Sequence, residues 1–178
     1  MAMQKKCYIL VGVSGVGKST WTSQLVKSAE ADGTKCGVFS LDQVRLDCYA
    51  RSEALLTAHT DESTTYAKAF EYVNSHKNEF DQAVNAAWYN TLNNCDIVVV
   101  DNTNLTRKSR NRWIQDARKK GFQICGVEFF APLSVLLARQ TTRGDKIIPE
   151  DVVRTMYMSQ QSLLLGSEVD MLELVTSF

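Results

Sequence analysis

The stretch that decides the fold is Gly12-Val-Ser-Gly-Val-Gly-Lys18-Ser19, which matches the pattern G-x-x-x-x-G-K-[ST]. The apolar run Cys7–Val13 leads into it and predicts a buried strand. A helical pattern follows, with apolar residues recurring every four positions from Trp21. Between a strand and a helix, the loop's backbone N–H groups and the helix N-terminus can surround a polyphosphate, because both present positive partial charge. The motif in this context predicts a phosphate-binding loop.

The residues of this loop have separate expected roles. Lys18 is expected to bridge the β- and γ-phosphates of ATP, and Ser19 to hold Mg²⁺ through its hydroxyl. The other nucleotide-binding positions of the motif and its flank are Gly12, Ser14, Gly15, Val16, Gly17 and Thr20. ATP and Mg²⁺ are therefore the expected cofactors, and the alternative is a chance match or a glycine turn without a ligand.

Strands and helices alternate along the rest of the chain. Further strands are expected at Cys36–Leu41, Ile97–Val100 and Phe122–Phe130. Helices are expected between them, one or two over Thr64–Leu92 and one over Thr106–Lys120. This alternation calls for a parallel sheet with right-handed crossovers. We therefore predict an α/β P-loop fold whose four-stranded parallel sheet has the order 2-3-1-4 and is flanked by helices.

The C-terminal part of the chain predicts two helices joined by a polar lid. Pro132 opens the first helix and Pro149 the second, both at favoured positions. The apolar face of the second helix is expected to contain Val152, Val153, Met156, Tyr157, Leu163 and Leu164. The lid covers about residues 139–149 and carries Arg139 and Arg143, which could close over a nucleotide and exclude water. Without internal repeats or linkers, residues 1–178 are expected to form one domain.

Composition limits the classes of function. Hydrophobic residues make up 44% and charged residues 22%, as is typical of a soluble globular protein. The 20 basic and 20 acidic residues cancel, so any binding of nucleic acid requires a local patch. No apolar stretch approaches the ~18 residues of a membrane span, so no membrane contact is expected. The five cysteines lack a C-x-x-C pair. Their scatter among apolar runs indicates reduced thiols and a cytoplasmic location, the host cytoplasm if the chain is phage-encoded.

Acidic residues follow two of the expected strands. Ile97–Asp101 resembles a Walker B strand, which lies beside the first strand and brings its acid close to the metal. Asp42 follows the second strand, where it can accept the proton of an attacking hydroxyl. Arg45, three residues on, would share a helical face with Asp42 and could bind a phosphate of the acceptor. As isolated features, these residues are also compatible with a strand end and a surface ion pair.

Taken together, these motifs resemble the kinase domain of bacteriophage-type 5′-hydroxyl polynucleotide kinases. The resembling segments are Gly12–Trp21, Asp42–Arg45, Asp101–Leu105 (D-N-T-N-L) and Arg139–Tyr157 (R-Q-T-T-R-G-D-K-I-I-P-E-D-V-V-R-T-M-Y). Their order and spacing agree with the family over nearly the whole chain. The resemblance implies transfer of the γ-phosphate of ATP to a 5′-hydroxyl end of DNA or RNA, as in end healing for repair and ligation.

The resemblance also implies roles for single residues. Asp42 would be the base that activates the 5′-hydroxyl, with Lys18 and Arg143 as the other catalytic residues. Arg45 would hold the acceptor phosphate next to that hydroxyl. Arg139 would belong to the nucleotide site in the lid. Asn102 and Thr103 would face the acceptor.

The chain departs from the phage pattern in one motif and lacks a second domain. Phage relatives place their acid directly before T-N, whereas Asn102 stands there and Asp101 lies one position earlier. Whether Asp101 or Asn102 orients the magnesium shell is therefore left open. No D-x-D-x-T phosphatase motif occurs, and no phosphatase domain is expected.

Two alternatives to this function remain at this stage. The first is a P-loop kinase for a small molecule such as a nucleoside or a sugar, and the second is an ATP-binding regulatory module. DNA versus RNA, the end geometry and homo-oligomer formation are not decided by sequence. Trp88 and Trp113 are expected in the core, and the basic segments 107–112 and 118–120 receive no site role.

Overall fold

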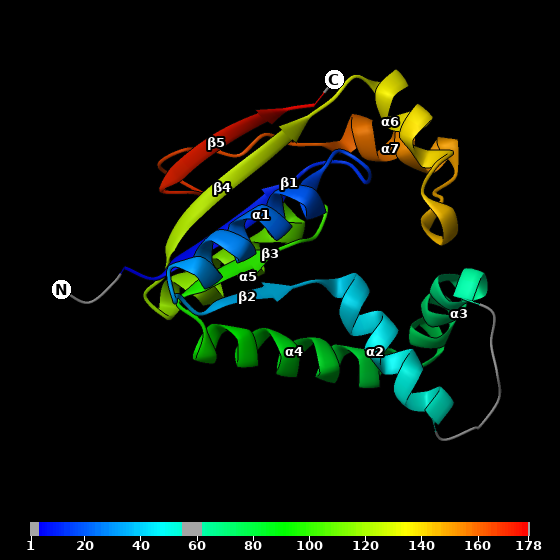
Figure 1. The fold of residues 1–178 in the computed structure, drawn as a ribbon, viewed down its shortest axis with the longest axis horizontal. Coiled ribbons are helices and arrows are strands. Elements are labelled where there is room, and N and C mark those ends of the chain that lie inside the picture. Colours follow the sequence, from blue (N-terminus) through cyan, green and yellow to red (C-terminus); the bar gives the residue numbers. More distant parts are fainter. Residues whose placement is uncertain (1–3, 55–61, 178) are drawn as a thin grey trace.

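The computed structural model describes residues 4–54 and 62–177, which form a parallel sheet with helices on both faces (Figure 1). The sheet has five strands in the order β2-β3-β1-β4-β5. Their bounds are β1 Lys6–Val11, β2 Cys36–Phe39, β3 Ile97–Val100, β4 Gln123–Phe130 and β5 Met171–Thr176. All four pairings are parallel, so the carboxyl ends of the strands meet at one edge of the sheet.

The central strand β1 is covered on both sides and is almost entirely apolar. It pairs with β3 from Lys6↔Ile97 and with β4 from Lys6↔Gln123. Ile9, Leu10 and Val11 are fully buried, as are the three valines of β3. A strand whose two faces are both covered by helices loses the alternation of apolar and polar residues, which accounts for the continuous apolar runs in the sequence.

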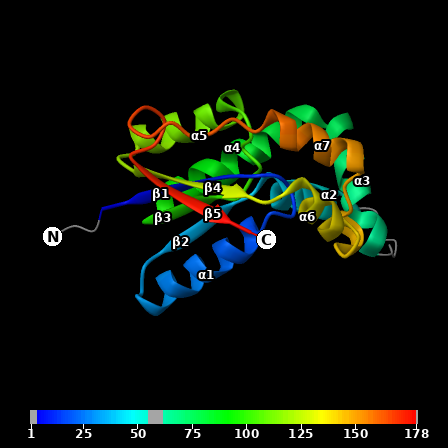
Figure 2. The same cartoon turned by 90° about the horizontal axis from the view of Figure 1, so that it is seen from above.

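Helices cover the two faces of the sheet unequally. Figure 2 shows α1 on one face and α4 and α5 on the other, whereas α6 and α7 lie beyond the carboxyl ends of the strands in Figure 1. The helices are α1 Lys18–Ala31, α2 Leu41–Ala54, α3 Glu62–Ser75, α4 Lys77–Asn94, α5 Arg107–Lys119, α6 Leu133–Gln140 and α7 Glu150–Ser159, with a short 3-10 helix η1 at Gly144–Lys146. The sequence left open whether residues 64–92 form one helix or two; there are two, because α3 ends at Ser75 and α4 begins at Lys77.

The prediction of four strands was wrong, because β5 adds a fifth strand beside β4. The order of the first four strands, 2-3-1-4, is as expected. The strand was missed because β5 lies at the sheet edge and its residues are mostly exposed, Leu174 by 62%. A partly exposed edge strand shows neither an apolar run nor a strict alternation.

The C-terminal helix is also shorter than expected. It ends at Ser159, so Leu163 and Leu164 belong to the segment that returns to the sheet rather than to α7. Leu163 is buried against the core, whereas Leu164 is 40% exposed. The helical period of the sequence continued past the end of the helix by coincidence.

The core on the α4 and α5 side contains the two tryptophans that were expected there. Trp88 and Trp113 pack on each other with ring centroids 5.2 Å apart, and both contact Phe39. The five cysteines are free thiols. None of the helices within residues 4–54 and 62–177 combines the length and apolar character that crossing a membrane requires.

Arg110, from one of the basic segments, lies inside the protein. Its side chain is fully buried. Its Nε and Nη2 donate to the two carboxylate oxygens of Glu168 at 2.8 and 2.9 Å. Nη1 and Nη2 also donate to the carbonyls of Gln161 and Ser162, at 2.8 and 3.0 Å. Arg110 therefore fixes the segment between α7 and β5 on top of α5.

Replacement of Arg110 by alanine is expected to lower the free energy of unfolding by about 3–5 kcal/mol, because Glu168 and two carbonyls would lose their partner. Urea denaturation measures this change. Arg107→Ala is the control. The Arg107 side chain is 58% exposed, and its Nε makes a longer contact, 3.7 Å, with the same Glu168 carboxylate. It should change stability by less than about 1 kcal/mol. Equal effects of the two substitutions would contradict the structural role of Arg110.

Candidate active site

The phosphate-binding loop lies where the sequence places it, between β1 and α1. Gly15 and Gly17 have φ angles of 87° and 109°, a region that side chains with a Cβ adopt at a cost. Helix α1 begins at Lys18, directly after Gly17. The backbone N–H of Gly12 donates to the carbonyl of Thr103 at 3.0 Å, which ties the loop to the D-N-T-N motif. A glycine turn therefore precedes the N-terminus of α1, and this arrangement suits the binding of an anion.

Lys18 points back into the loop that it is expected to serve. Its Nζ donates to the carbonyls of Gly12 and Val13, at 2.7 and 3.0 Å. Burial lowers the pKa of Lys18 to about 8, and the guanidinium of Arg143 contributes to the lowering while Asp101 opposes it. A buried ammonium held by neutral carbonyls gains from a bound anion, so a polyphosphate would stabilise its charged form.

Asp101 lies at the carboxyl end of β3 and close to the start of α1. Its backbone N–H donates to the carbonyl of Phe39 at 2.9 Å. Burial raises the pKa of Asp101, while the Lys18 ammonium and the Ser19 hydroxyl act in the opposite direction. A hydroxyl and a carboxylate that lie side by side are oxygen donors of the kind that Mg²⁺ takes together with phosphate oxygens and water. The residues present therefore fit the expected metal.

The side-chain amide of Asn102 already uses its oxygen in a hydrogen bond to the backbone of α2. Its Oδ1 accepts the backbone N–H of Leu41 at 2.8 Å, at the first residue of α2. Its Nδ2 is buried without a hydrogen-bond partner among the described residues. A donor that is unpartnered and buried costs free energy unless a ligand satisfies it. This amide can donate to a ligand but, with Oδ1 engaged, it is a weak candidate for a metal.

Asp42 stands in the first turn of α2 and is flanked by two donors. Arg45 Nη1 lies 2.6 Å from Asp42 Oδ1, and the Tyr66 hydroxyl donates to the same oxygen at 3.0 Å. The Asp42 side chain is 50% exposed, whereas that of Arg45 is only 13% exposed. Asp42 and Arg45 therefore share a helical face as expected, and the arginine of the pair is largely buried while the aspartate is half exposed.

Arg45 is enclosed by aromatic rings. Its guanidinium carbon lies 5.1 Å from the ring centroid of Phe70 and 5.5 Å from that of Phe80. Its Nε is buried and makes no hydrogen bond within the described residues. Among the residues that the structure describes, the guanidinium contacts two rings and one carboxylate, which leaves donors for a further anion in the planar geometry that suits phosphate.

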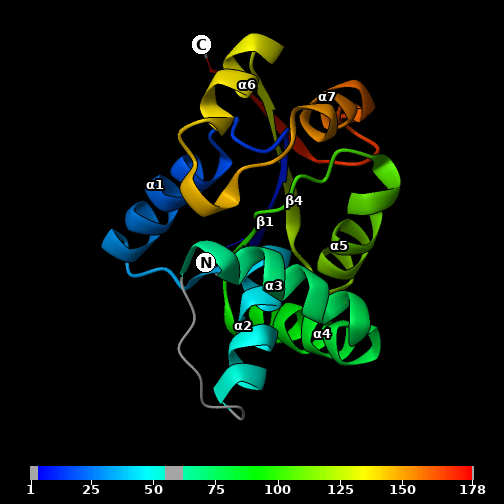
Figure 3. The ribbon, with the colours of Figure 1, turned by 90° about the vertical axis from the view of Figure 1, so that its right-hand side faces the viewer.

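The lid arginines lie over the phosphate-binding loop, and Figure 3 shows the segment between α6 and α7 reaching toward α3. Arg143 Nη1 donates to the Ser14 hydroxyl at 2.5 Å, and Arg139 Nη1 to the carbonyl of Gly15 at 3.4 Å. Both cations therefore face the loop on which a γ-phosphate would rest. The lid lies on the site in this structure.

Gln140 was missed by sequence reasoning, although it joins the lid to the loop. The side chain is buried, its Nε2 donates to the carbonyl of Ser14 at 3.2 Å, and its Oε1 accepts the N–H of Ile148 at 3.4 Å. A Cβ added to Gly15 would lie 2.9 Å from Gln140 Nε2. Only its position between the two arginines could have indicated this role.

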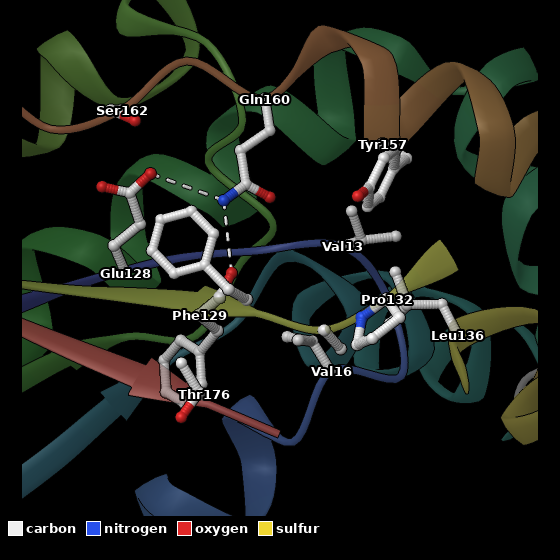
Figure 4. Close-up of a pocket in the computed structure, with 12 residues that line it drawn as sticks. Val13, Val16, Glu128, Phe129, Pro132, Leu136, Tyr157, Gln160, Ser162 and Thr176 are labelled. Carbon is white, nitrogen blue, oxygen red and sulfur yellow. Dashed lines mark hydrogen bonds between the residues drawn. The ribbon is translucent and has the colours of Figure 1, made fainter. Parts of the chain in front are cut away.

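Two cavities adjoin the loop. The smaller, about 430 Å³, lies between the start of α1, Arg139 and the end of β5, and Thr20 and Gln24 contribute to its wall. The larger, about 600 Å³, lies between β4, α6 and α7 (Figure 4). There Gln160 Nε2 donates to the carbonyl of Phe129 at 3.2 Å. Of the residues assigned from sequence, only Val16 lines the larger cavity, so that cavity lies outside the predicted site.

The fold and the loop define a nucleotide-binding domain of the P-loop kinase class. The model of the AAA domain family, AAA_33, matches residues 8–163. The chain therefore belongs to the AAA domain family.

Solved structures confirm the fold. A gluconokinase from Sinorhizobium meliloti 1021 is 18% identical, with a TM-score of 0.54, and the match covers 97% of this chain and 82% of that one. Chaetomium thermophilum Kti12 in complex with ADP-AlF3 is 13% identical, with a TM-score of 0.62, and the match covers 96% and 88%. At these identities the likeness establishes the P-loop kinase fold alone.

Proposed function

We propose that this protein is an ATP-dependent kinase that transfers the γ-phosphate to the 5′-hydroxyl end of DNA or RNA. The observation that carries the proposal is the Asp42–Arg45 pair at the carboxyl edge of the sheet, on the same edge as the loop. A carboxylate beside a cation with spare donors suits an acceptor that carries a hydroxyl and a phosphate close together. The end of a polynucleotide has this arrangement, because a phosphate lies one nucleotide in from its 5′-hydroxyl.

The donor nucleotide occupies the loop and the smaller cavity in this proposal. The phosphates of ATP bind to the backbone N–H groups of the loop and to Lys18. The adenine ring lies in the cavity beside Arg139 and Thr20. Ser19 and Asp101 would hold Mg²⁺, which would supply positive charge to neutralise the phosphates. The engagement of Asn102 Oδ1 with Leu41 supports Asp101 rather than Asn102 on the metal side.

The transfer follows from the positions of the charged side chains. Asp42 accepts the proton of the acceptor hydroxyl as its oxygen bonds to the γ-phosphorus and the bond to the β–γ bridging oxygen breaks, leaving ADP. Lys18 and Arg143 place positive charge around the phosphoryl group as it is transferred. Arg45 holds the acceptor phosphate, assisted by the unpartnered Nδ2 of Asn102 and by Thr103. The lid, residues 139–149, excludes water from the reaction.

A second candidate is a kinase of a small molecule such as a sugar or a nucleoside. The likeness in fold to a gluconokinase over 97% of the chain favours it. This candidate uses the same loop, the same base and the same lid. It differs in the role of Arg45, since an acceptor without a phosphate leaves the spare donors of that guanidinium unused.

Two substitutions in α2 are expected to fail in different ways. Asp42→Asn keeps the shape and removes the base, so the maximal rate should fall by about 10²–10⁴-fold with acceptor binding largely retained. Arg45→Leu should instead raise the KM for the acceptor at least about tenfold, through loss of a charged hydrogen bond. The measurement is initial rate against concentration for a nucleoside, its 3′-monophosphate and a short oligonucleotide with a 5′-hydroxyl.

The matched control is Arg51→Leu, on the same helix, whose side chain bonds to Asp47 and Cys48. It should leave all three acceptor curves unchanged. If the nucleoside serves as well as its 3′-monophosphate, and Arg45→Leu leaves that ranking unchanged, the acceptor is a small molecule and the second candidate holds.

A further inference from the structure

The carboxylate of Asp42 is held from one side only. Arg45 and Tyr66 both donate to Oδ1, and no donor among the described residues contacts Oδ2. With one oxygen held by two donors, the carboxylate cannot rotate without breaking both hydrogen bonds. Oδ2 is then left as the oxygen that can take a proton from an acceptor.

Tyr66 comes from a different helix than the residue it contacts. Asp42 and Arg45 lie on α2, whereas Tyr66 lies on α3. The ring of Tyr66 is partly buried. Burial, with the nearby negative charge of Asp42, raises the pKa of the Tyr66 phenol, so the hydroxyl stays protonated and remains a donor. This hydrogen bond therefore fixes the orientation of Asp42 with respect to α3.

The other face of Tyr66 is in contact with the lid. The ammonium of Lys146, in η1, lies 5.7 Å from the centroid of the Tyr66 ring. The helices η1 and α3 pack against each other, a contact visible in Figure 3. A cation at this distance is attracted to the negative face of the ring. The lid thus touches the same side chain that holds the base.

We propose that Tyr66 is the positioning residue of Asp42, and that Lys146 keeps Tyr66 in place when the lid lies over the phosphate-binding loop. The carboxylate of Asp42 is then correctly oriented only when the lid is closed. An open lid leaves this catalytic base misaligned, so phosphate transfer to water is slow in that state. This inference rests on the proposed function, in which Asp42 is the base.

The first experiment is Tyr66→Phe, which removes the hydroxyl and retains the ring. We expect kcat for phosphate transfer to fall by about 10- to 100-fold, the range for a hydrogen bond to a charged group, with the KM for ATP unchanged. Tyr72→Phe is the matched control on the same helix, because its hydroxyl donates to the Glu79 carboxylate away from the site. Its kcat should equal that of the wild type.

The second experiment tests the link to the lid with a double-mutant cycle. Lys146→Met should lower kcat by about threefold or more in the wild type, the effect of losing a cation–π contact. It should have no further effect in Tyr66→Leu, where the ring is gone. Thermal unfolding of each variant establishes that the fold is kept.

The outcomes separate this inference from the proposed function. If Tyr66→Phe has wild-type kcat while Asp42→Asn is inactive, Tyr66 does not position the base although the proposed function stands. If Lys146→Met lowers kcat equally with and without the ring, the lid does not act through Tyr66. Wild-type turnover of Asp42→Asn would instead overturn the proposed function itself.

Discussion

Replacement of Lys18 by alanine is expected to lower kcat/KM for ATP by at least about 10³-fold, because the lysine supplies charge to the phosphoryl group in a site that excludes water. The Nζ of Lys18 is 2.7 Å from the carbonyl of Gly12, so the ammonium already lies within the loop. The measurement is the initial rate with radiolabelled ATP, together with ADP binding by calorimetry. The initial rate should fall and the affinity for ADP should decrease, with the far larger effect on the rate.

The control for this substitution is Lys27→Ala, an exposed lysine on the same helix. It should leave the rate and the binding unchanged. Because Lys18 is buried, the unfolding temperature of Lys18→Ala must be recorded as well. A folded Lys18→Ala protein with normal turnover would rule out phosphoryl transfer at this loop.

The second large effect is expected from the lid. Arg143→Ala should reduce kcat by about 10³-fold or more, as is found for arginines that contact the phosphoryl group in flight. Its Nη1 is 2.5 Å from the Ser14 hydroxyl, so the guanidinium already stands at the loop. Arg143→Lys should recover only part of the loss, since a point charge does not replace the planar donor pair. Single-turnover kinetics with saturating ATP measure the step directly.

Arg154→Ala provides the comparison, because this exposed arginine of α7 forms an ion pair with Glu150 on its own helix. Its kcat should stay within a factor of about two, in line with the small contribution of an exposed ion pair. Normal turnover in both Arg143 variants would show that the lid serves some other purpose.

The loop between β1 and α1 could be predicted from the sequence because each part of it is local. The loop, the strand before it and the helix after it occupy neighbouring positions in the chain, and the period of apolar residues identifies all three. Asp42 and Arg45 were equally accessible to prediction, since three residues separate them on one helix. The lid arginines are also close in sequence, on either side of Gln140.

Contacts between distant segments could not be predicted in the same way. Tyr66 meets Asp42 across 24 residues, and Gln140 meets Ser14 across 126. Nothing in the local pattern of either residue indicates its partner. The burial of Arg110 was not predicted for a different reason. A basic residue among other basic residues suggests a solvated surface, and its partner Glu168, 58 positions away, gives no local signal. The edge strand β5 lacks the apolar pattern that burial on both faces produces.

The order of the strands has a consequence for how the chain is made. β1 is synthesised before the strands that it pairs with, because its partners are β3 and β4, whose first paired residues, Ile97 and Gln123, stand far along the chain. Pairings of such large sequence separation form slowly, because the loop between them must close first. The apolar strand β1 therefore stays without these partners until β3 and β4 have been synthesised. During that interval the nascent chain is open to aggregation and to chaperone binding.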